Sequence, residues 1–322
     1  MVGPHSGETT VAGVDSSTQS TKVEIRRIDD GVILSGGRAP HPPTTPPVSE
    51  QDPESWWAAL GSAWEEAIST GHQPSAVSVA GQQHGMVVLD SERRVVRPAK
   101  LWNDTESAPD AAWLIKNVPG GAAALARSTG SVPVAAFTVT KLSWLHRSEP
   151  QSWERLAHVL LPHDWITYRM TGGLTTDRGD ASGTGYFDPV AGTYVDEVLA
   201  TVDGDRDWSD ALPRVLGPTE VAGEWGNLLV GPGTGDNMAA ALGMALALGD
   251  AAMSIGTSGT VYACTDVPAR DESGAVAGFA DATGRFLPLV CTLNGAKVLD
   301  AARRLLGVDH DTFDEKIGRA HV

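Results

Sequence analysis

Two carboxylates stand at the ends of short runs, where they could take part in chemistry. Asp15 follows the apolar residues 11–14 and opens a cluster of small hydroxyl-bearing residues. Asp236 closes a glycine-rich loop and precedes a helix-forming stretch. Asp15 could hold Mg²⁺, which prefers one or two carboxylates together with phosphate oxygens and water, or it could cap its own turn. Asp236 could be a general base toward a substrate hydroxyl or the N-cap of the following helix.

Two short polar turns could bind phosphate. Backbone amides in tight Ser/Thr/Gly turns form concave sites for phosphate oxygens, and hydroxyl side chains add donors without bulk. Each turn alone is also typical of an ordinary chain reversal. Two turns of similar design favour a phosphate clamp, and we expect it to comprise Ser16, Ser17, Thr18 and Gln19 in the first turn and Gly256, Thr257, Ser258 and Gly259 in the second.

Neutral hydrogen-bonding side chains gather in two further loops. Gln83 and His84 lie between two apolar runs, and Asn103 and Asp104 follow the apolar pair 101–102. A lone loop histidine is commonly a packing residue, but amide and imidazole groups together suit a ligand with many hydroxyls. These four residues therefore predict a sugar-binding site.

Other chemistries find no support in the sequence. It has no Gly-x-x-x-x-Gly-Lys-Ser/Thr motif, and no Gly-x-Gly-x-x-Gly opens a helix directly after a strand. It also has no Gly-x-Ser-x-Gly elbow and no His, Cys, Asp and Glu cluster with zinc spacing. P-loop, dinucleotide-binding, serine hydrolase and zinc hydrolase interpretations are disfavoured.

Composition limits the class of protein and its partners. The chain has 322 residues, of which 41% are hydrophobic and 20% charged, as in ordinary globular proteins. Its 24 basic and 40 acidic residues give a formal net charge of −16, which repels nucleic acid and anionic membranes. Two cysteines exclude a disulfide-dense secreted class, and neither an export signal nor a membrane span is visible. We expect a cytoplasmic protein.

The elements that must position these residues mix helices and strands. Residues 11–25 predict a strand-turn-strand hairpin, and residues 76–80 and 86–90 predict two more strands. A helix should begin at Pro53 with Asp52 as its N-cap, because Trp56 and later apolar residues recur every four positions.

Further along the chain, helical spacing is seen over residues 138–146 and 152–171, and residues 237–247 are strong helix formers. Residues 252–263 predict a second hairpin similar to the first. The recurrence of a similar hairpin far along the chain favours a duplicated fold with two similar half-sites.

Taken together, these motifs resemble the FGGY carbohydrate kinases, and among them those that act on D-xylulose. Order and spacing match over nearly the whole chain. The stretches that carry the resemblance are GVDSSTQSTK at 13–22, GQQHG at 81–85, LWND at 101–104, KLSW at 141–144, LPHD at 161–164, TDRGDASGT at 176–184, GDN at 235–237 and SIGTSGT at 254–260.

The resemblance implies an α/β fold of the actin-like ATPase (ribonuclease H-like) type, in which two domains close on a cleft. It implies ATP-dependent phosphorylation of D-xylulose to D-xylulose 5-phosphate, with ATP and Mg²⁺ as cofactors. Asp236 would be the catalytic base and Asp15 would place the metal. Gln83, His84, Asn103 and Asp104 would hold the ketose, and the two turns would hold phosphates. Position 83 is Gln where the family commonly has Met, so ribulose, gluconate and glycerol stay open as substrates.

We expect a frayed segment 1–10, a sugar-binding domain 11–248 and an incomplete nucleotide-binding domain 249–322. The glycine-rich adenosine-binding segment implied by the resemblance is absent, and residues 317–322 read like a translated sequencing adapter. The natural protein is therefore expected to be longer, and the chain as given could be an inactive sugar-binding fragment with exposed apolar surface. An actin-like filament or chaperone ATPase would not explain the sugar-binding residues, and a homodimer stays open.

Overall fold

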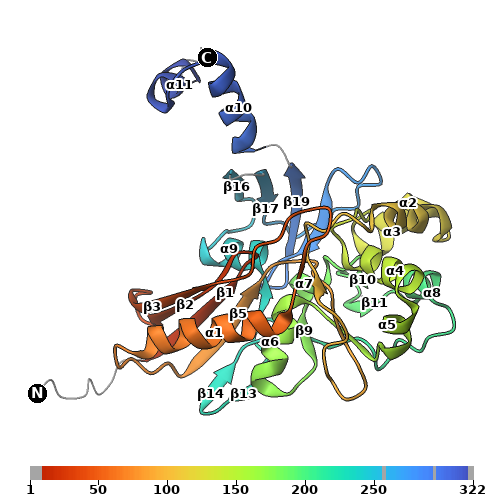
Figure 1. Cartoon of the computed structure of the whole chain (residues 1–322), viewed down its shortest axis with the longest axis horizontal. Helices are drawn as coiled ribbons and strands as arrows, with labels where there is room; N and C mark the ends of the chain where they lie inside the picture. The colour runs from red at the N-terminus through yellow and green to blue at the C-terminus, as the bar shows by residue number, and fades with distance from the viewer. Residues whose placement is uncertain (1–8, 256–258, 293–294, 318–322) are drawn as a thin grey trace, which may run out of the picture.

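The computed structural model describes residues 9–255, 259–292 and 295–317. Its larger sheet has the order β13-β14-β5-β1-β2-β3, with β15 also paired to β5 (Figure 1). Strands β1 and β2 form the predicted antiparallel hairpin, while β5 runs parallel to β1, β14 and β15. The strands are β1 (Thr10–Ser16), β2 (Ser20–Arg27), β3 (Ile33–Pro40), β5 (Ala76–Gly81), β13 (Gly223–Trp225), β14 (Leu228–Val230) and β15 (Thr234–Gly235).

The register brings three chain segments to one edge of this sheet. Asp15 is aligned with Ala80 of β5, and Gly235 is aligned with Gly81. Because parallel strands present their carboxyl ends at the same edge, the loops that follow β1, β5 and β15 meet there.

Helix α1 (Pro53–Ile68) lies against this sheet and confirms the predicted helix start. The Asp52 side chain accepts a 3.0 Å hydrogen bond from the Glu54 amide, which satisfies a donor of the first turn. Trp56 is fully buried and meets Trp165 of α6 (Pro162–Thr171) edge to face, with ring centroids 6.1 Å apart. One core cluster therefore joins both helices to the sheet.

A second group of helices packs around another core cluster on the opposite side of the molecule (Figure 1). Its helices are α2 (Ala108–Asn117), α3 (Gly121–Thr129), α4 (Thr138–Ser148), α5 (Pro150–Arg155) and α8 (Asp196–Val202). The short helix α7 (Arg178–Ala181) contacts β15 and β18 (Ala277–Ala280). Paired short strands accompany them: β4 (Glu50–Gln51) with β7 (Ala99–Lys100), β6 (Val87–Leu89) with β8 (His158–Leu160), β9 (Thr175–Asp177) with β12 (Arg214–Leu216), and β10 (Phe187–Asp188) with β11 (Thr193–Tyr194).

Residues beyond α9 (Asp236–Gly243) form a second, antiparallel sheet with the order β16-β17-β19-β18. It comprises β16 (Ala251–Ile255), β17 (Gly259–Ala263), β18 (Ala277–Ala280) and β19 (Phe286–Thr292), so the predicted second hairpin is confirmed. Phe279 and Leu287 share one core cluster with Phe137 and Met238. Apolar packing thus crosses residue 248, where the sequence predicted a domain boundary; that boundary stays a prediction.

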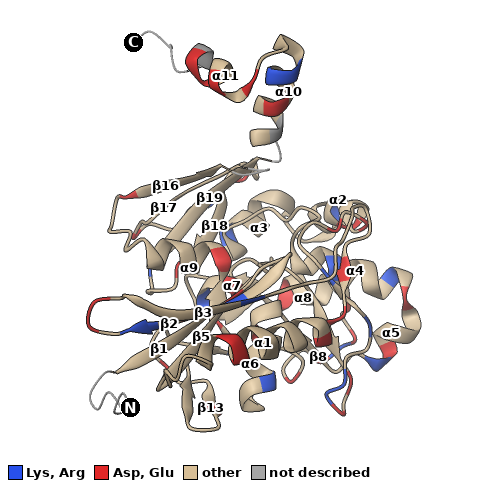
Figure 2. Ribbon diagram, turned by 60° about the vertical axis from the view of Figure 1, so that its left-hand side comes forward, with Lys and Arg blue, Asp and Glu red and all other residues tan. Residues whose placement is uncertain are grey.

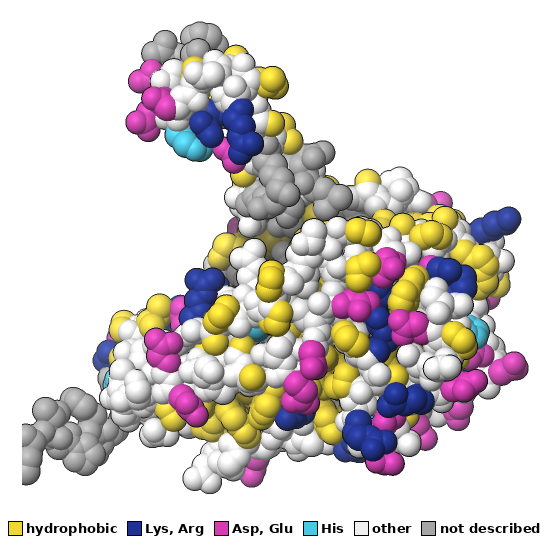
Figure 3. Space-filling model, viewed as in Figure 1, with side chains coloured by type: hydrophobic (Ala, Val, Ile, Leu, Met, Phe, Trp, Pro, Cys, Tyr) yellow, Lys and Arg dark blue, Asp and Glu magenta, His cyan; other side chains and the backbone are white. Residues whose placement is uncertain are grey.

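Helices α10 (Ala296–Leu306) and α11 (His310–Ile317) project away from the body of the molecule (Figures 1 and 2). Several apolar side chains of α10 face outward, and Leu305 is 88% exposed. Yellow side chains are visible on this projection in the space-filling view (Figure 3). In the described part of the chain, no helix combines the length and apolar character that a bilayer crossing requires.

Two local predictions are wrong, and one of the two alternatives for Asp236 is excluded. Residues 152–171 are not one helix, because residues 158–160 pair with β6 and Pro162 starts a new helix. The helix predicted over 237–247 ends at Gly243, since Ala245 takes a left-handed conformation (φ 53°) and the chain turns so that Leu246 packs against the core. Asp236 is the first helical residue, and the N-cap position is held by Gly235.

Candidate functional site

The carboxyl edge of the larger sheet gathers the first predicted site residues. Asp15 is the penultimate residue of β1, Gln83 follows β5, and Asp236 follows β15. The charge of Asp15 is close enough to Asp236 to raise the pKa of that carboxyl group. The sheet therefore brings together both predicted catalytic carboxylates from positions more than 200 residues apart.

Asp15 is half-exposed and forms an ion pair with Lys22, which stands opposite it on β2 at 3.1 Å. The Asp15 carboxylate suits Mg²⁺, because a carboxylate that is open to solvent and near a second one, here Asp236, can bind the cation together with water and phosphate oxygens. Lys22 would also place a positive charge beside bound phosphate.

The predicted phosphate turn after β1 is tied to the predicted sugar loops. Thr18 donates its hydroxyl proton to Gln82 Oε1 at 3.1 Å and accepts a 2.9 Å hydrogen bond from the Trp102 indole. Within the turn, Ser17 donates through both its amide and its hydroxyl to the Ser20 carbonyl. Ser16 is buried and Gln19 is exposed. A ligand phosphate held by this turn would therefore lie next to the loops that carry the amide side chains.

The second predicted phosphate turn lies mostly outside the described residues. Positions 256–258, predicted as Gly256, Thr257 and Ser258, are not described. Gly259 is described: it is buried and opens β17 opposite Thr292.

Gln83 links the predicted sugar loop directly to α9. It is 4% exposed, and its Oε1 accepts a 2.7 Å hydrogen bond from Asn237 Nδ2. The same Asn237 side chain donates to Asp236 Oδ1 at 3.0 Å, and the Asn237 amide does so at 2.8 Å. Gln83 Nε2 is buried and has no hydrogen-bond partner within the described chain, so it is available as a donor to a ligand.

The electrostatics of Asp236 suit a proton acceptor. Burial and the nearby charge of Asp15 raise the pKa of Asp236 to about 6, although the hydrogen bonds from Asn237 oppose the change. A carboxylate with this pKa is ionised at neutral pH yet is a better base than an ordinary aspartate.

His84 is held as a neutral imidazole. Its Nδ1 lies 2.7 Å from the Gly183 carbonyl oxygen, and its ring packs against Phe137 and Phe279, at centroid distances of 4.9 and 5.4 Å. Burial, reinforced by the charge of Lys141, lowers the pKa of His84 to about 3. Because a carbonyl can only accept, Nδ1 carries the proton and Nε2 is left as an acceptor for a hydroxyl.

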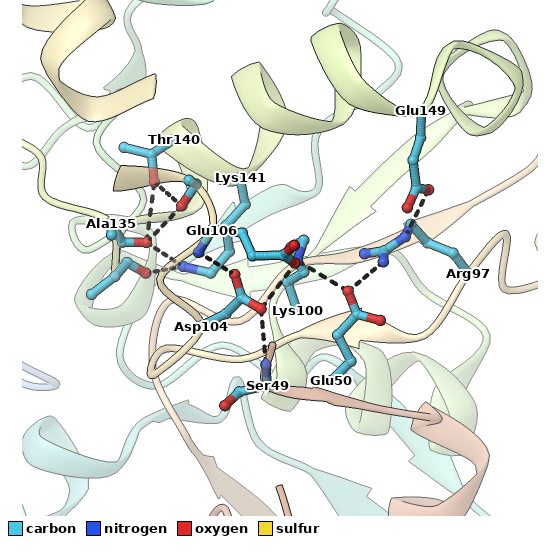
Figure 4. A network of polar contacts seen from close by, with 12 residues as sticks. Ser49, Glu50, Arg97, Lys100, Asp104, Glu106, Ala135, Thr140, Lys141 and Glu149 are labelled. Carbon is cyan, nitrogen blue, oxygen red and sulfur yellow. Dashed lines mark hydrogen bonds and ion pairs between the residues drawn. The ribbon is translucent and has the colours of Figure 1, made fainter. Parts of the chain in front are cut away.

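Asp104 belongs to an ion network behind the sugar loop (Figure 4). Its Oδ2 accepts from the Ser49 amide at 2.9 Å and pairs with Lys100 Nζ at 3.0 Å, and its Oδ1 accepts from the Glu106 amide at 3.1 Å. Lys100 also binds Glu50 and Glu106, at 3.0 and 2.6 Å. Asp104 is fully buried and both of its oxygens are engaged by the protein, so it supports the loop from inside.

Asn103 lies between this network and the loop surface. Its side chain is half-buried, and Oδ1 has no hydrogen-bond partner among the described residues. Of the two predicted sugar contacts in this loop, Asn103 therefore has the freer polar atom.

The three acids around Lys100 could in principle hold a metal ion, since their ligand atoms lie within 4.8 Å of one another. The ammonium group of Lys100 already occupies the space among them. Burial alone would lower the pKa of Lys100, but Glu106, Glu50 and Asp104 together raise it. The cation of this cluster is therefore lysine.

A buried cluster of one imidazole and three carboxylates lies beneath the site, and the sequence reasoning assigned it no role. His163 Nδ1 contacts Asp180 Oδ2 at 2.8 Å, and its Nε2 lies 3.1 Å from Asp164 and 3.7 Å from Asp177. All four side chains are buried. The available signal was the polar pair His163-Asp164 immediately before the apolar Trp165 and Ile166.

Two surface hollows lie apart from these residues. One, of about 530 Å³, is lined by the arginine-rich segment 93–97 and by α6. The other, of about 820 Å³, lies between α2, α4 and residues 201–205. Neither is lined by a predicted site residue, so the candidate site is defined by its side-chain geometry.

The chain is similar to known proteins over most of its length. Residues 10–243 match the model of the N-terminal domain of the FGGY family of carbohydrate kinases. The chain is 47% identical over 313 residues to the xylulose kinase of Streptomyces rubiginosus, covering 94% of this chain and 64% of that protein. It is 34% identical over 315 residues to the xylulose kinase of Escherichia coli, covering 92% of this chain and 63% of that protein.

Among solved structures, the xylulose kinase from Bifidobacterium adolescentis superimposes with a TM-score of 0.87 at 39% identity, covering 94% of this chain and 68% of that one. The fold is thus the predicted α/β, actin-like sugar kinase fold. The chain spans a little under two thirds of the length of the curated relatives it matches. Together, the family match, the identity to these relatives and the shared fold lead to one conclusion: the chain belongs to the FGGY family of carbohydrate kinases.

Proposed function

We propose that the protein containing this chain transfers the γ-phosphoryl group of ATP to D-xylulose and releases D-xylulose 5-phosphate and ADP. The observation that carries the proposal is the Asp236–Asn237–Gln83 chain of hydrogen bonds at the sheet edge, next to Asp15. It places a carboxylate of raised pKa beside a free amide donor. The identity to xylulose kinases supports D-xylulose as the substrate.

Asp236 takes the proton of the sugar's terminal hydroxyl as that oxygen forms its bond to the γ-phosphorus. The bond between the γ-phosphorus and the β,γ-bridging oxygen breaks, and ADP carries away that electron pair. Because phosphoryl transfer depends mostly on positioning and charge neutralisation, few other groups are required. Asp15 would hold Mg²⁺, which neutralises phosphate charge.

The sugar is held by neutral groups of matched polarity. Gln83 Nε2 donates to one hydroxyl and His84 Nε2 accepts from another, while Asn103 Oδ1 offers a further acceptor. Asp104 holds the 101–104 loop through its bonds to Ser49 and Lys100. The phosphates are assigned to the turn Ser16–Gln19 and to Gly256–Gly259. A cytoplasmic location fits this reaction.

A coupled assay for ADP release, with D-xylulose, D-ribulose, gluconate and glycerol compared, tests this function. We expect kcat/KM to be highest for D-xylulose. Asp236→Asn should lower kcat by roughly 10²- to 10⁴-fold, the usual contribution of a positioned base, with D-xylulose affinity retained. Asp29→Asn, at an exposed position in the β2–β3 turn, should be neutral. Unchanged kcat in the Asp236 variant would exclude the base assignment.

A second candidate function is sugar binding without phosphoryl transfer by the chain as it stands. It is favoured by the location of the predicted sugar contacts, all within residues 10–243, the part that matches the family's N-terminal domain. Separate calorimetric titrations with D-xylulose and with a non-hydrolysable ATP analogue distinguish the two. Sugar binding with no nucleotide binding would support the second function, and binding of both would exclude it.

A further inference from the structure

The His163–Asp180 pair lies directly behind the two loops that carry Gln83 and Asp236. A Cβ atom added to Gly81, at the end of β5, would lie 2.7 Å from His163 Cβ. One added to Gly233, just before β15, would lie 2.5 Å from His163 Cδ2. His163 is therefore packed closely against the chain on both sides, where only glycine leaves enough room.

Asp180 reaches the same place from α7. A Cβ atom on Gly235 would lie 2.7 Å from Gln83 Cγ and 3.1 Å from Asp180 Oδ1. Gln83 and Asp180 thus fill the space beside the residue that immediately precedes Asp236. While Asp180 Oδ2 pairs with His163, Oδ1 is buried and without a hydrogen-bond partner in the described structure.

Asp177 anchors this arrangement to the base-carrying loop. Its carboxylate accepts hydrogen bonds from the Gly179 and Asp180 amides, at 2.8 and 2.9 Å, and so caps α7. It also accepts from the Thr234 hydroxyl at 2.7 Å. Thr234 lies two residues before Asp236, so buried residues join the start of α7 to the base by a short path.

We propose that Asp180, held by His163, is a positioning residue for Asp236: it supports the backbone at Gly235 and the Gln83 side chain, and it places a buried negative charge behind the base. The inference rests on the proposed function for the role of Asp236, but the contacts themselves do not depend on it. Nothing in the reaction as derived above uses either residue of the pair.

The charges around Asp236 agree with this arrangement. Asp15 of β1, Asp180 of α7 and Tyr262 of β17 each interact electrostatically with it. Burial would lower the pKa of His163, but Asp164, Asp180 and Asp177 together raise it, so the imidazole is a cation. Burial raises the pKa of Asp180, and the charge of Asp236 adds to the effect although His163 opposes it. Because the repulsion between the Asp180 and Asp236 carboxylates is mutual, it raises the pKa of both groups.

The test follows the titration of Asp236 in the sugar-free protein through the side-chain amide resonances of Gln83 and Asn237. In Asp180→Asn we expect the midpoint to fall by about one unit, because a like charge nearby is removed without a change of shape. The matched control is Asp90→Asn, which also alters a buried carboxylate but one bound to Arg94 and Arg155; its midpoint should equal that of the wild type. An unchanged midpoint in folded Asp180→Asn, or an equal shift in Asp90→Asn, would overturn the proposal.

A second variant separates geometry from charge and decides the matter if Asp180→Asn fails to fold. Thr234→Val removes the hydroxyl bond to Asp177 at nearly constant volume. We expect displaced Gln83 and Asn237 amide resonances with an unchanged titration midpoint, and a several-fold weaker affinity for D-xylulose. Unmoved resonances would overturn the positioning role. Absence of D-xylulose binding by the wild-type chain would count against the proposed function alone, because the titration needs no sugar.

Discussion

Gln83 Oε1 accepts a 2.7 Å hydrogen bond from Asn237 Nδ2, across 154 positions of the chain. The bond joins the loop after β5 to the first turn of α9. It also fixes the orientation of the Gln83 amide, because an oxygen committed to Asn237 leaves the nitrogen facing elsewhere. The amide that could recognise a sugar hydroxyl is therefore oriented by the neighbour of the candidate base.

Asn237→Ala should release the Gln83 amide and weaken D-xylulose binding by about 5- to 30-fold, the value of one or two kcal/mol for a buried hydrogen bond whose partner is lost. Calorimetry with D-xylulose measures the effect. Asn117→Ala is the matched control, because the Asn117 side chain bonds the Trp113 carbonyl at the exposed end of α2. Equal affinities in both variants would contradict the role of the Gln83–Asn237 bond.

Gly183→Ala should displace His84. A Cβ atom at this position would lie 2.6 Å from His84 Cε1 and 2.7 Å from Nδ1, and the ring cannot retreat because Phe137 and Phe279 stand beside it. We expect at least a tenfold loss of D-xylulose affinity and a destabilisation of about 1 to 3 kcal/mol from overpacking.

Gly61→Ala provides the comparison for that substitution. Gly61 lies inside α1 with no atom within 4 Å of the added Cβ position, so alanine should stabilise the chain by about 0.5 to 1 kcal/mol through helix propensity. Chemical unfolding of both variants measures the change in the free energy of unfolding, which should be negative for Gly183→Ala and positive for Gly61→Ala. A Gly183→Ala protein that binds D-xylulose as the wild type does would show that the His84 position is unimportant.

Asp236 should cost the folded chain stability at neutral pH. Its pKa is about 6 when folded, against 3.8 for an ordinary aspartate, so the folded state holds the proton more tightly. The protonated Asp236 therefore stabilises the folded state at low pH, and this stabilisation is lost as the pH rises through about 4 to 6. The free energy of unfolding of Asp236→Asn should therefore exceed that of the wild type by a margin that grows by roughly 1 to 2 kcal/mol between pH 4.5 and 8.

Asp90→Asn should behave differently over the same range. Hydrogen bonds from the backbone and side chain of Arg94, helped by Arg155, lower the pKa of Asp90 to about 2. The ionised Asp90 therefore stabilises the folded state fully at any pH above the ordinary aspartate pKa of 3.8. This stabilisation is lost only as the pH falls toward 2. This variant should be destabilised equally at pH 4.5 and 8. A margin for Asp236→Asn that stays constant with pH would refute the raised pKa.

Local patterns explain which features the sequence could predict. The hairpin at 11–25, the helix start at Pro53 and the strand at 76–80 depend on neighbouring residues, and each is found. Gln83 was recognisable because it follows the predicted strand at 76–80, and Asp236 because it closes a glycine-rich loop just before a predicted helix. The resemblance to a family supplied the roles, since a loop sequence by itself does not show which ligand it meets.

Features that depend on distant contacts were not predictable in this way. The strand at 158–160 exists because β6, 70 positions earlier, pairs with it, while its own sequence also fits a helical spacing. His163 and Asp180 become partners only when α6 and α7 pack beneath the β5 and β15 loops. No periodic pattern in the sequence predicts the contact between His163 and Asp180.

Lys100→Met should be among the most destabilising single substitutions in this chain. Lys100 is fully buried, lies 3.9 Å from the Trp144 ring centroid and is the shared cation of Glu50, Asp104 and Glu106. Methionine matches its volume but leaves three carboxylates facing one another. Breaking a buried ion pair from one side typically costs about 3 to 5 kcal/mol, and the 101–104 loop with Asn103 should lose its support at the same time.

Lys22→Met is the matched control, because the Lys22–Asp15 pair has side chains 46% and 42% exposed and surface pairs contribute about 0 to 1 kcal/mol. Unfolding in urea compares the two variants. Since the three acids lie within 4.8 Å of one another, Ca²⁺ should restore part of the stability of Lys100→Met by replacing the lost cation, and it should have no such effect on Lys22→Met. A Lys100 variant as stable as the wild type would show that the carboxylates are neutralised by protons, so that the lysine is not required to hold the sugar loop.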